Sequence, residues 1–225
     1  EFDSVIDNFS QSKSIGDCWL LSSLQALSST PGGAQIIKNQ IKWSDDYKSV
    51  EVYLAGIDKT IRLSAQSIVE ARNSGFGSTG DEDVMIVELA IQQIRELEGG
   101  KAIDFWNIFL RGGDYSTEAA SKTSRTLSAN SVDAWLQKLW VLKQEGKTFA
   151  AVFSLFSDGS TNRGCPTENC GNFSYTNDGG HGFAIIDITS STVTFANPWD
   201  SAKTYIVSWE NFKTIGIYRI ESYAF

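Results

Sequence analysis

Residues 11–29 read QSKSIGDCWLLSSLQALSS and place one cysteine, Cys18, between Asp17 and Trp19 at the start of a predicted helix. One face of this helix carries leucines at helical spacing, namely Leu20, Leu21, Leu24 and Leu27. The Pro-Gly-Gly at 31–33 is expected to stop it. A cysteine in this position is either a buried core residue or a nucleophile. Because a helix N-terminus stabilises a thiolate, we favour the nucleophile.

The composition of the chain excludes several classes of protein. With 225 residues, 41% of them hydrophobic and 20% charged, the chain is long enough for one large domain or two small lobes with a real core. A net charge of −8 argues against nucleic acid or an anionic membrane as a partner. No stretch approaches the roughly 20 apolar residues of a membrane span. The chain begins with Glu-Phe, so we expect other domains in a longer parent chain.

The two remaining cysteines, Cys165 and Cys170, lie in the segment CPTENC. They either form a short disulfide or stay free thiols, and two cysteines alone do not make a zinc site. A disulfide would favour a secreted or cell-surface location, and free thiols a cytoplasmic one. We expect no metal and no required cofactor.

The order of the predicted elements indicates an α+β fold. A hairpin is expected in 49–64, a helix in 81–99, a short helix in 99–116, and a helix in 131–146 with Ser131 as its cap and Gly146 at its end. Strands are expected in 147–156, 181–189, 191–199, 203–209 and 216–225. We therefore expect a mainly helical lobe, 1–146, that carries the cysteine, and an antiparallel β lobe, 147–225.

His181 is the only histidine of the chain, and it opens one of these strands. Asn197 ends the next strand, 16 positions further on (197 − 181). If the two strands pair as a hairpin, Asn197 comes close enough to hydrogen-bond the imidazole. Trp199, just after Pro198, would then cover that bond from water.

These residue types fit nucleophilic catalysis by a thiol. An ordinary thiol, with a pKa of about 8.5, is mostly protonated at neutral pH, and a helix N-terminus and an imidazolium both lower that pKa. A neutral asparagine orients the ring without competing for its proton. We therefore expect Cys18 to be the nucleophile, His181 the general acid and base, and Asn197 the orienting residue.

Three segments, GDCWLL with a glutamine upstream, GGHGFAI and NPW, together resemble the catalytic domain of calpain-type cysteine proteases. The resemblance spans nearly the whole chain. It implies a papain-like fold of two lobes and a cysteine endopeptidase that hydrolyses protein or peptide substrates through a thioester acyl-enzyme. The compact form resembles a microbial version of the family.

The resemblance also implies roles for further residues. The backbone N–H of Cys18 would form half of an oxyanion hole. Three glycines, Gly112, Gly113 and Gly180, would hold the backbone of an extended substrate. Residues flanking the catalytic ones would support them, namely Gly16, Asp17, Trp19 and Trp199.

Two departures from the family pattern matter. The family glutamine of the oxyanion hole lies six positions before the cysteine, where this chain has Ser12, and Gln11 lies seven before it (18 − 11). We expect Gln11 to take the role, with Ser12 as the alternative. Animal calpains use calcium, but the acidic run at 81–83 has no recognisable ligand spacing, so we expect that calcium is not required.

Two other functions fit parts of the pattern. A transglutaminase-like acyltransferase would also use a cysteine and a histidine, but usually with an aspartate where this chain has Asn197. A calpain-like binding module without activity would be consistent with the shifted Gln11.

Overall fold

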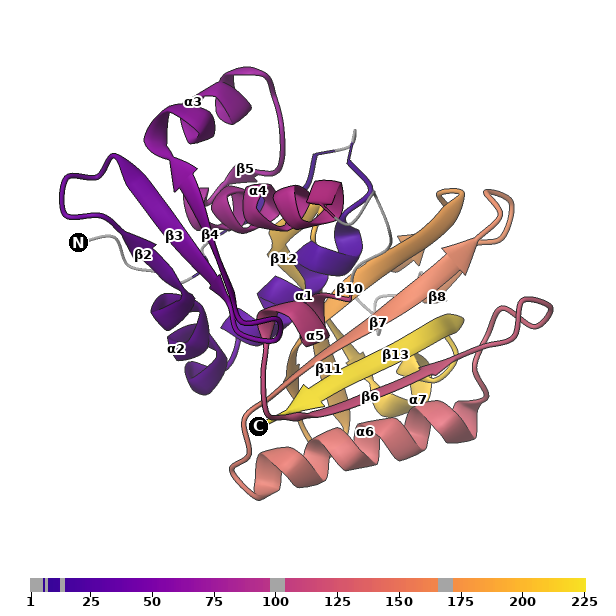
Figure 1. The fold of residues 1–225 in the computed structure, drawn as a ribbon. Coiled ribbons are helices and arrows are strands. Elements are labelled where there is room, and N and C mark those ends of the chain that lie inside the picture. Colours follow the sequence, from indigo (N-terminus) through magenta and orange to yellow (C-terminus); the bar gives the residue numbers. More distant parts are fainter. Residues whose placement is uncertain (1–5, 7, 13–14, 98–103, 166–171) are drawn as a thin grey trace.

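The computed structural model describes residues 6, 8–12, 15–97, 104–165 and 172–225. These residues form an α+β fold with antiparallel sheets, as the order of the elements predicts. Buried apolar side chains divide into two clusters, one drawn mainly from residues 9–110 and the other from 132–220. In Figure 1 the indigo-to-magenta first half lies at the upper left and the orange-to-yellow second half at the lower right. None of the described helices is long and apolar enough to cross a membrane.

The first half combines helices with a three-stranded meander. The expected hairpin is confirmed, with Ser49 paired to Ser64 and Leu54 to Lys59. The Pro-Gly-Gly segment does not simply end a helix, because Thr30 caps a second helix there by accepting the N–H of Gly33. The elements of this half are α1 (Cys18–Ser28), α2 (Pro31–Gln40), β2 (Ile41–Trp43), β3 (Ser49–Leu54), β4 (Lys59–Ser64), α3 (Ala65–Asn73), α4 (Glu82–Leu97) and α5 (Phe105–Phe109).

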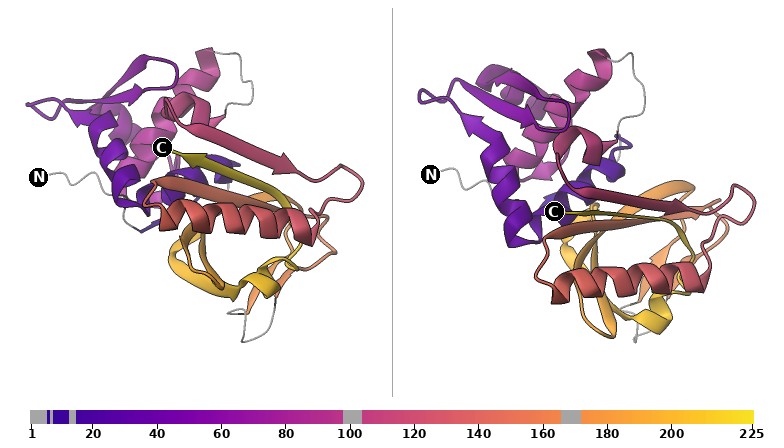
Figure 2. Two further views of the ribbon diagram at one scale, coloured as in Figure 1. Left: turned by 90° about the horizontal axis from the view of Figure 1, so that it is seen from below. Right: turned by 60° about the horizontal axis from the view of Figure 1, so that its bottom comes forward.

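The second half is built on a six-stranded sheet of order β12-β11-β10-β7-β13-β6. Its strands are β6 (Asp114–Ala119), β7 (Phe149–Ser157), β10 (Gly179–Ile188), β11 (Thr192–Asn197), β12 (Asp200–Ser208) and β13 (Ile217–Ala224). A small hairpin of β8 (Arg163–Cys165) and β9 (Phe173–Tyr175) and the helices α6 (Ala129–Gln144) and α7 (Trp209–Phe212) complete it. Figure 2 shows α6 lying along one face of this sheet.

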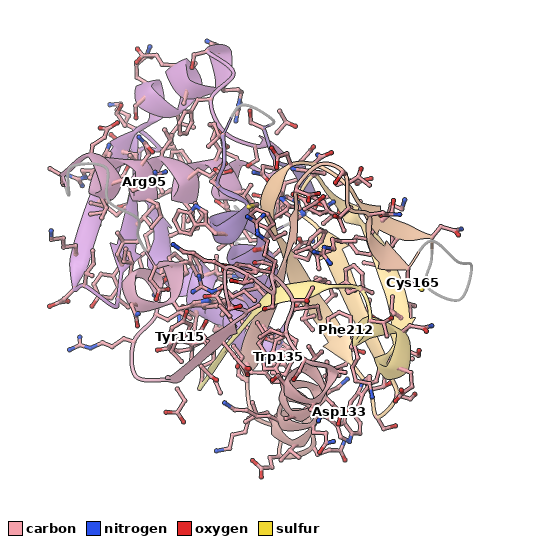
Figure 3. The ribbon with its side chains drawn as sticks, turned by 90° about the vertical axis from the view of Figure 1, so that its right-hand side faces the viewer. Arg95, Tyr115, Asp133, Trp135, Cys165 and Phe212 are labelled. Atoms are coloured by element: carbon pink, nitrogen blue, oxygen red, sulfur yellow. The ribbon has the colours of Figure 1, made fainter. Side chains whose placement is uncertain are left out.

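The expected boundary at residue 146 does not match the packing. Strand β6 pairs with β13, and α6 buries its apolar stripe in the second cluster, so both belong with the sheet. Figure 3 places Trp135 of α6 and Phe212 of α7 in this half, away from Arg95 of α4. The periodicity of α6 predicts an apolar face but not the surface it covers. Its cap is Ser128, which accepts the N–H of Ser131, so the expected cap at Ser131 is wrong.

Helix α1 contributes its apolar side chains to the first cluster, packs against β10 and β7 of the sheet, and is buried on nearly all sides. The sheet face that meets it carries small side chains, because Gly182, Ala184 and Ala150 alternate with the large residues of the second cluster. A β-carbon at Gly182 would lie 2.8 Å from Ser22 Oγ and 3.3 Å from the carbonyl oxygen of Cys18. The start of α1 therefore rests directly on β10.

A short segment near the N-terminus ties the two halves together. Strand β1 (Phe9–Ser10) pairs with β5 (Thr79–Gly80) of the first half. The same two residues reach the second half, where Phe9 N–H donates to Ser201 Oγ at 2.7 Å and Ser10 Oγ donates to the carbonyl of Trp199 at 2.6 Å. We call residues 8–12 the N-terminal strap.

The contact between α1 and β10 leads to a test by paired substitution. Gly182→Ala should destabilise the protein by roughly 1–3 kcal/mol, because the new methyl group overlaps Ser22 Oγ. Ser22→Ala removes a buried hydroxyl that has no hydrogen-bond partner, so alone it should be close to neutral. The double variant should recover most of the loss in urea denaturation. Simple addition of the two single effects would contradict this account.

Candidate active site

A cavity of about 450 Å³ opens where the strap, the start of α1 and the start of β10 meet. It brings together residues that are far apart in the chain, namely Gln11, Ser12, Ile15, Gly16, Cys18, Tyr175, Asn177, Asp178, Gly180, His181 and Trp199. Cys18 and His181 thus share one cavity although they lie 163 positions apart in the chain (181 − 18).

Cys18 is the first residue of α1, and backbone N–H groups of the first turn point at its sulfur. The N–H of Gly182 on β10 also donates to the sulfur. These bonds favour the thiolate, but burial outweighs them and raises the pKa of Cys18 above its usual value. The expectation that the pKa of the Cys18 thiol is lowered is therefore wrong for the site without a bound substrate.

The imidazole of His181 is held by Asn197. Strands β10 and β11 pair as the expected hairpin, and His181 Nε2 lies 2.7 Å from Asn197 Oδ1. The backbone N–H of Trp199 donates to the same Oδ1 at 3.0 Å, which fixes which side of the amide faces the ring. Because Oδ1 can only accept, Nε2 carries the hydrogen, and the lone pair of the neutral ring is on Nδ1.

Aromatic side chains surround the imidazole on three sides. The ring of Trp199 stacks on it with centroids 4.1 Å apart, as the expected cover of the His181–Asn197 bond requires. Tyr175 stacks at 5.6 Å, and the edge of Phe183 approaches at 4.9 Å. This burial lowers the pKa of His181 to about 4, although the hydrogen bond that His181 donates to Asn197 acts in the opposite direction. Sequence reasoning missed Tyr175, whose only signal is the short FSY strand within a polar loop.

Gln11 and Ser12 both line the cavity. Gln11 N–H donates to the carbonyl of Pro198 at 2.8 Å, which anchors the strap beside the Asn197 turn. Its side-chain Nε2 donates to the carbonyl of Ile15 at 2.9 Å and to Asp17 Oδ1 at 3.1 Å. Both amide hydrogens of Gln11 are therefore in use, and one bond must break before Gln11 can donate to a bound substrate.

The glycines expected to bind substrate fall in two places. Gly180 lines the cavity, and no atom lies within 4 Å of where its β-carbon would be, so its backbone is open to a ligand. Gly112 and Gly113 do not line it. The N–H of Gly113 donates to Tyr223 OH at 2.8 Å, close to the end of β13. Both glycines lie in the loop that joins α5 to β6, and the sequence does not reveal where this loop runs. The prediction that Gly112 and Gly113 line the substrate site is therefore wrong for this cavity.

The flanking residues also have distinct surroundings. Gly16 lines the cavity and is exposed. Asp17 is buried and does not line the cavity, and its carboxyl group contacts Gln11 of the strap and Glu88 of α4. Trp19 instead lines a neighbouring cavity of about 410 Å³ together with Ser23 of α1, residues 95 and 104–106 of the first half, and residues 219 and 221 of β13.

Within the described ranges, no group of three or more histidine, cysteine or carboxylate side chains could hold a metal ion. The acidic run at 81–83 belongs to the start of α4, where Asp81 Oδ1 accepts the N–H of Asp83. The expected choice between a disulfide and free thiols at Cys165 and Cys170 involves a residue, Cys170, that lies outside the described part of the chain.

No protein-family model matches this chain, and a search of curated proteins also finds no match.

The lowered pKa of His181 predicts how the stability of the protein depends on pH. A pKa of about 4 in the folded state against 6.5 in the unfolded state gives stability that is present above pH 6.5 and is lost as the pH falls through 4. Between pH 7 and 4 the free energy of unfolding of the wild type should fall by roughly 3 kcal/mol more than that of His181→Gln. Denaturation at several pH values measures this difference, and parallel curves for the two proteins would refute it.

Proposed function

We propose that this chain is a calpain-type cysteine endopeptidase domain with a papain-like fold of two lobes. The observation that carries the proposal is the 2.7 Å bond between His181 Nε2 and Asn197 Oδ1, in the same cavity as a cysteine at a helix N-terminus. The motifs GDCWLL, GGHGFAI and NPW supply these three residues.

The proposed reaction begins with attack of Cys18 Sγ on the carbonyl carbon of a peptide bond. His181 Nδ1 accepts the thiol proton as the sulfur–carbon bond forms, and the carbonyl π electrons move to its oxygen. The tetrahedral intermediate collapses, the carbon–nitrogen bond breaks, and the imidazolium gives its proton to the leaving amine. Water, activated by the same imidazole, then hydrolyses the thioester.

Burial favours the neutral forms of Cys18 and His181 before a substrate binds. Burial raises the pKa of the Cys18 thiol and lowers that of the His181 imidazole, so both groups are neutral near pH 7. Proton transfer then accompanies attack, and Asn197 Oδ1 stabilises the imidazolium that forms, since its hydrogen bond raises the pKa of the ring. The N–H groups of the first turn of α1 stabilise charge on the sulfur.

The overall arrangement supports the same proposal. Helix α1 belongs to the first hydrophobic cluster and packs against the sheet that carries the second, and the cavity lies where the two halves meet at the start of that helix. The open backbone at Gly180 suits an extended peptide that binds through main-chain hydrogen bonds. The neutral Asn197 as the partner of His181 favours a protease over a transglutaminase-like acyltransferase.

The first test is loss of activity in Cys18→Ala. This variant should hydrolyse peptides at least about 10³-fold more slowly than the wild type, because the attacking atom is gone. Its stability should stay within roughly 1 kcal/mol, since Cys18 is only partly buried. A large loss of stability in this variant would instead assign Cys18 to the core.

Labelling with a peptidyl epoxysuccinyl inhibitor, followed by mass mapping, complements this test. Modification of Cys18 both with calcium and with a chelator is the expected result. Modification only with calcium would overturn the expected calcium independence. Absence of modification in a folded protein would favour the binding-module alternative.

A matched pair of variants decides which side chain, together with the backbone N–H of Cys18, donates a hydrogen bond in the proposed oxyanion hole. Gln11→Ala should lower kcat by about 10²–10³ with little change in KM, because an oxyanion donor acts mainly in the transition state. Ser12→Ala should have a much smaller effect. Stopped-time peptide hydrolysis measures both, and the reverse order would assign the role to Ser12.

A further inference from the structure

Two carboxyl groups lie together beneath the start of α1. Asp17 is 5% exposed and Glu88, on α4, is 3% exposed, and their side chains are hydrogen-bonded to each other. No described residue forms an ion pair with either of them. Two buried carboxylates without a cation repel each other strongly, so a proton must lie between them.

The hydrogen bonds around the pair assign the proton to Asp17. The N–H of Ser78 donates to both oxygens of Glu88, at 2.9 and 3.1 Å, and Ser78 Oγ donates at 2.6 Å. These donors stabilise a carboxylate on Glu88. Burial and the neighbouring Glu88 raise the pKa of Asp17 to about 8. Asp17 Oδ1 accepts from Gln11 Nε2, and the protonated carboxyl group of Asp17 donates to Glu88.

The backbone loop beside Glu88 is shaped for this contact. Gly77 has a φ of +77°, and a β-carbon there would lie 2.9 Å from Glu88 Oε2. The loop thereby brings the N–H of Ser78 onto the carboxylate, and Ser78 is itself buried. The pair is therefore enclosed by protein on the side away from the cavity.

The side chain of Asp17 leaves the first turn of α1 uncapped. Its backbone carbonyl accepts the N–H groups of Leu20 and Leu21, but its carboxyl group makes no cap hydrogen bond. An aspartate at this position usually accepts an N–H of the first turn. Here those donors stay available to Cys18, whose sulfur receives them.

We propose that Asp17 and Glu88 share one proton and act together as a positioning pair for the nucleophile, anchoring Gln11 and keeping a second negative charge away from Cys18. The effect of this pair on catalysis rests on the proposed protease function, whereas the geometry of the pair is independent of that function. Asp17 and Glu88 do not themselves line the cavity, and they act on it through Gln11 and Cys18, so they are positioning residues.

The proposal predicts a specific response to pH. The groups that face Asp17 are Glu88 from α4 and the Cys18 thiol from α1, with neutral Gln11 on the strap. Below about pH 8 the pair carries one negative charge, and above it a second charge appears on Asp17. That charge raises the pKa of the Cys18 thiol and slows its reaction.

The test is the rate of Cys18 alkylation by iodoacetamide between pH 6 and 10, in the wild type and in Asp17→Asn. The asparagine amide can donate to Glu88 and accept from Gln11 as the protonated acid does, but it cannot ionise. The ratio of variant to wild-type rate constants should be near one below pH 7 and rise several-fold above pH 8.5. A ratio that does not change with pH overturns the proposal.

Two further variants separate this effect from general changes in charge. Glu88→Gln removes the neighbouring carboxylate that, together with burial, raises the pKa of Asp17, so alkylation should begin to fall below that of Asp17→Asn at a lower pH than it does in the wild type. Asp83→Asn is the matched control, because Asp83 is also buried and burial raises its pKa to about 6. It should keep the wild-type alkylation profile, and a change in that profile would count against the proposal.

Thermal melting gives an independent readout. A folded-state pKa near 8 against 3.8 unfolded means that Asp17 contributes stability that is full below pH 4 and is lost as the pH rises to 8. The melting temperature of Asp17→Asn relative to wild type should therefore rise from pH 5 to 8 and then level off. A constant difference argues against a shared proton. Neither readout needs peptide hydrolysis, so an inactive wild type would refute the protease and leave this test intact.

Discussion

The packing of α1 against the small-residue face of the six-stranded sheet is the contact on which the rest of the structure depends. Gly182 lets the backbone of β10 approach Ser22 and Cys18 directly, and no larger residue fits there without movement. That approach brings the N–H of Gly182 to the Cys18 sulfur and places His181, its neighbour in sequence, in the same cavity. One close contact thus joins the two hydrophobic clusters and builds the candidate site.

Burial decides the charge state of this site. The usual account of a reactive cysteine invokes a helix N-terminus and a nearby imidazole, and both are present here. The aromatic enclosure of His181 and the burial of Cys18 nevertheless disfavour both charged forms. The cavity therefore holds a neutral thiol and a neutral imidazole near pH 7.

The N-terminal strap and the carboxyl pair support the site from opposite sides. The strap pairs with β5, hydrogen-bonds to Pro198 and Ser201, and carries Gln11 into the cavity. The carboxyl group of Asp17 accepts a hydrogen bond from the side-chain amide of Gln11 and is hydrogen-bonded to Glu88. The strap, the start of α1 and α4 are thereby connected by buried hydrogen bonds, so a change of charge at Asp17 affects Gln11 as well as Cys18.

The sequence by itself determined the α+β class, most helices and strands, and the partnership of His181 with Asn197. These follow from local periodicity and from a hairpin, in which nearby positions must pair. Only the tertiary structure decided that β6 joins the sheet and that α6 covers it. It also decided that Gly112 and Gly113 lie away from the cavity, that Tyr175 stacks on His181, and that Glu88 lies against Asp17. The physical reason is that periodicity reveals an apolar face without its partner, and that burial, which sets the charge of Asp17, Cys18 and His181, depends on segments far away in the chain.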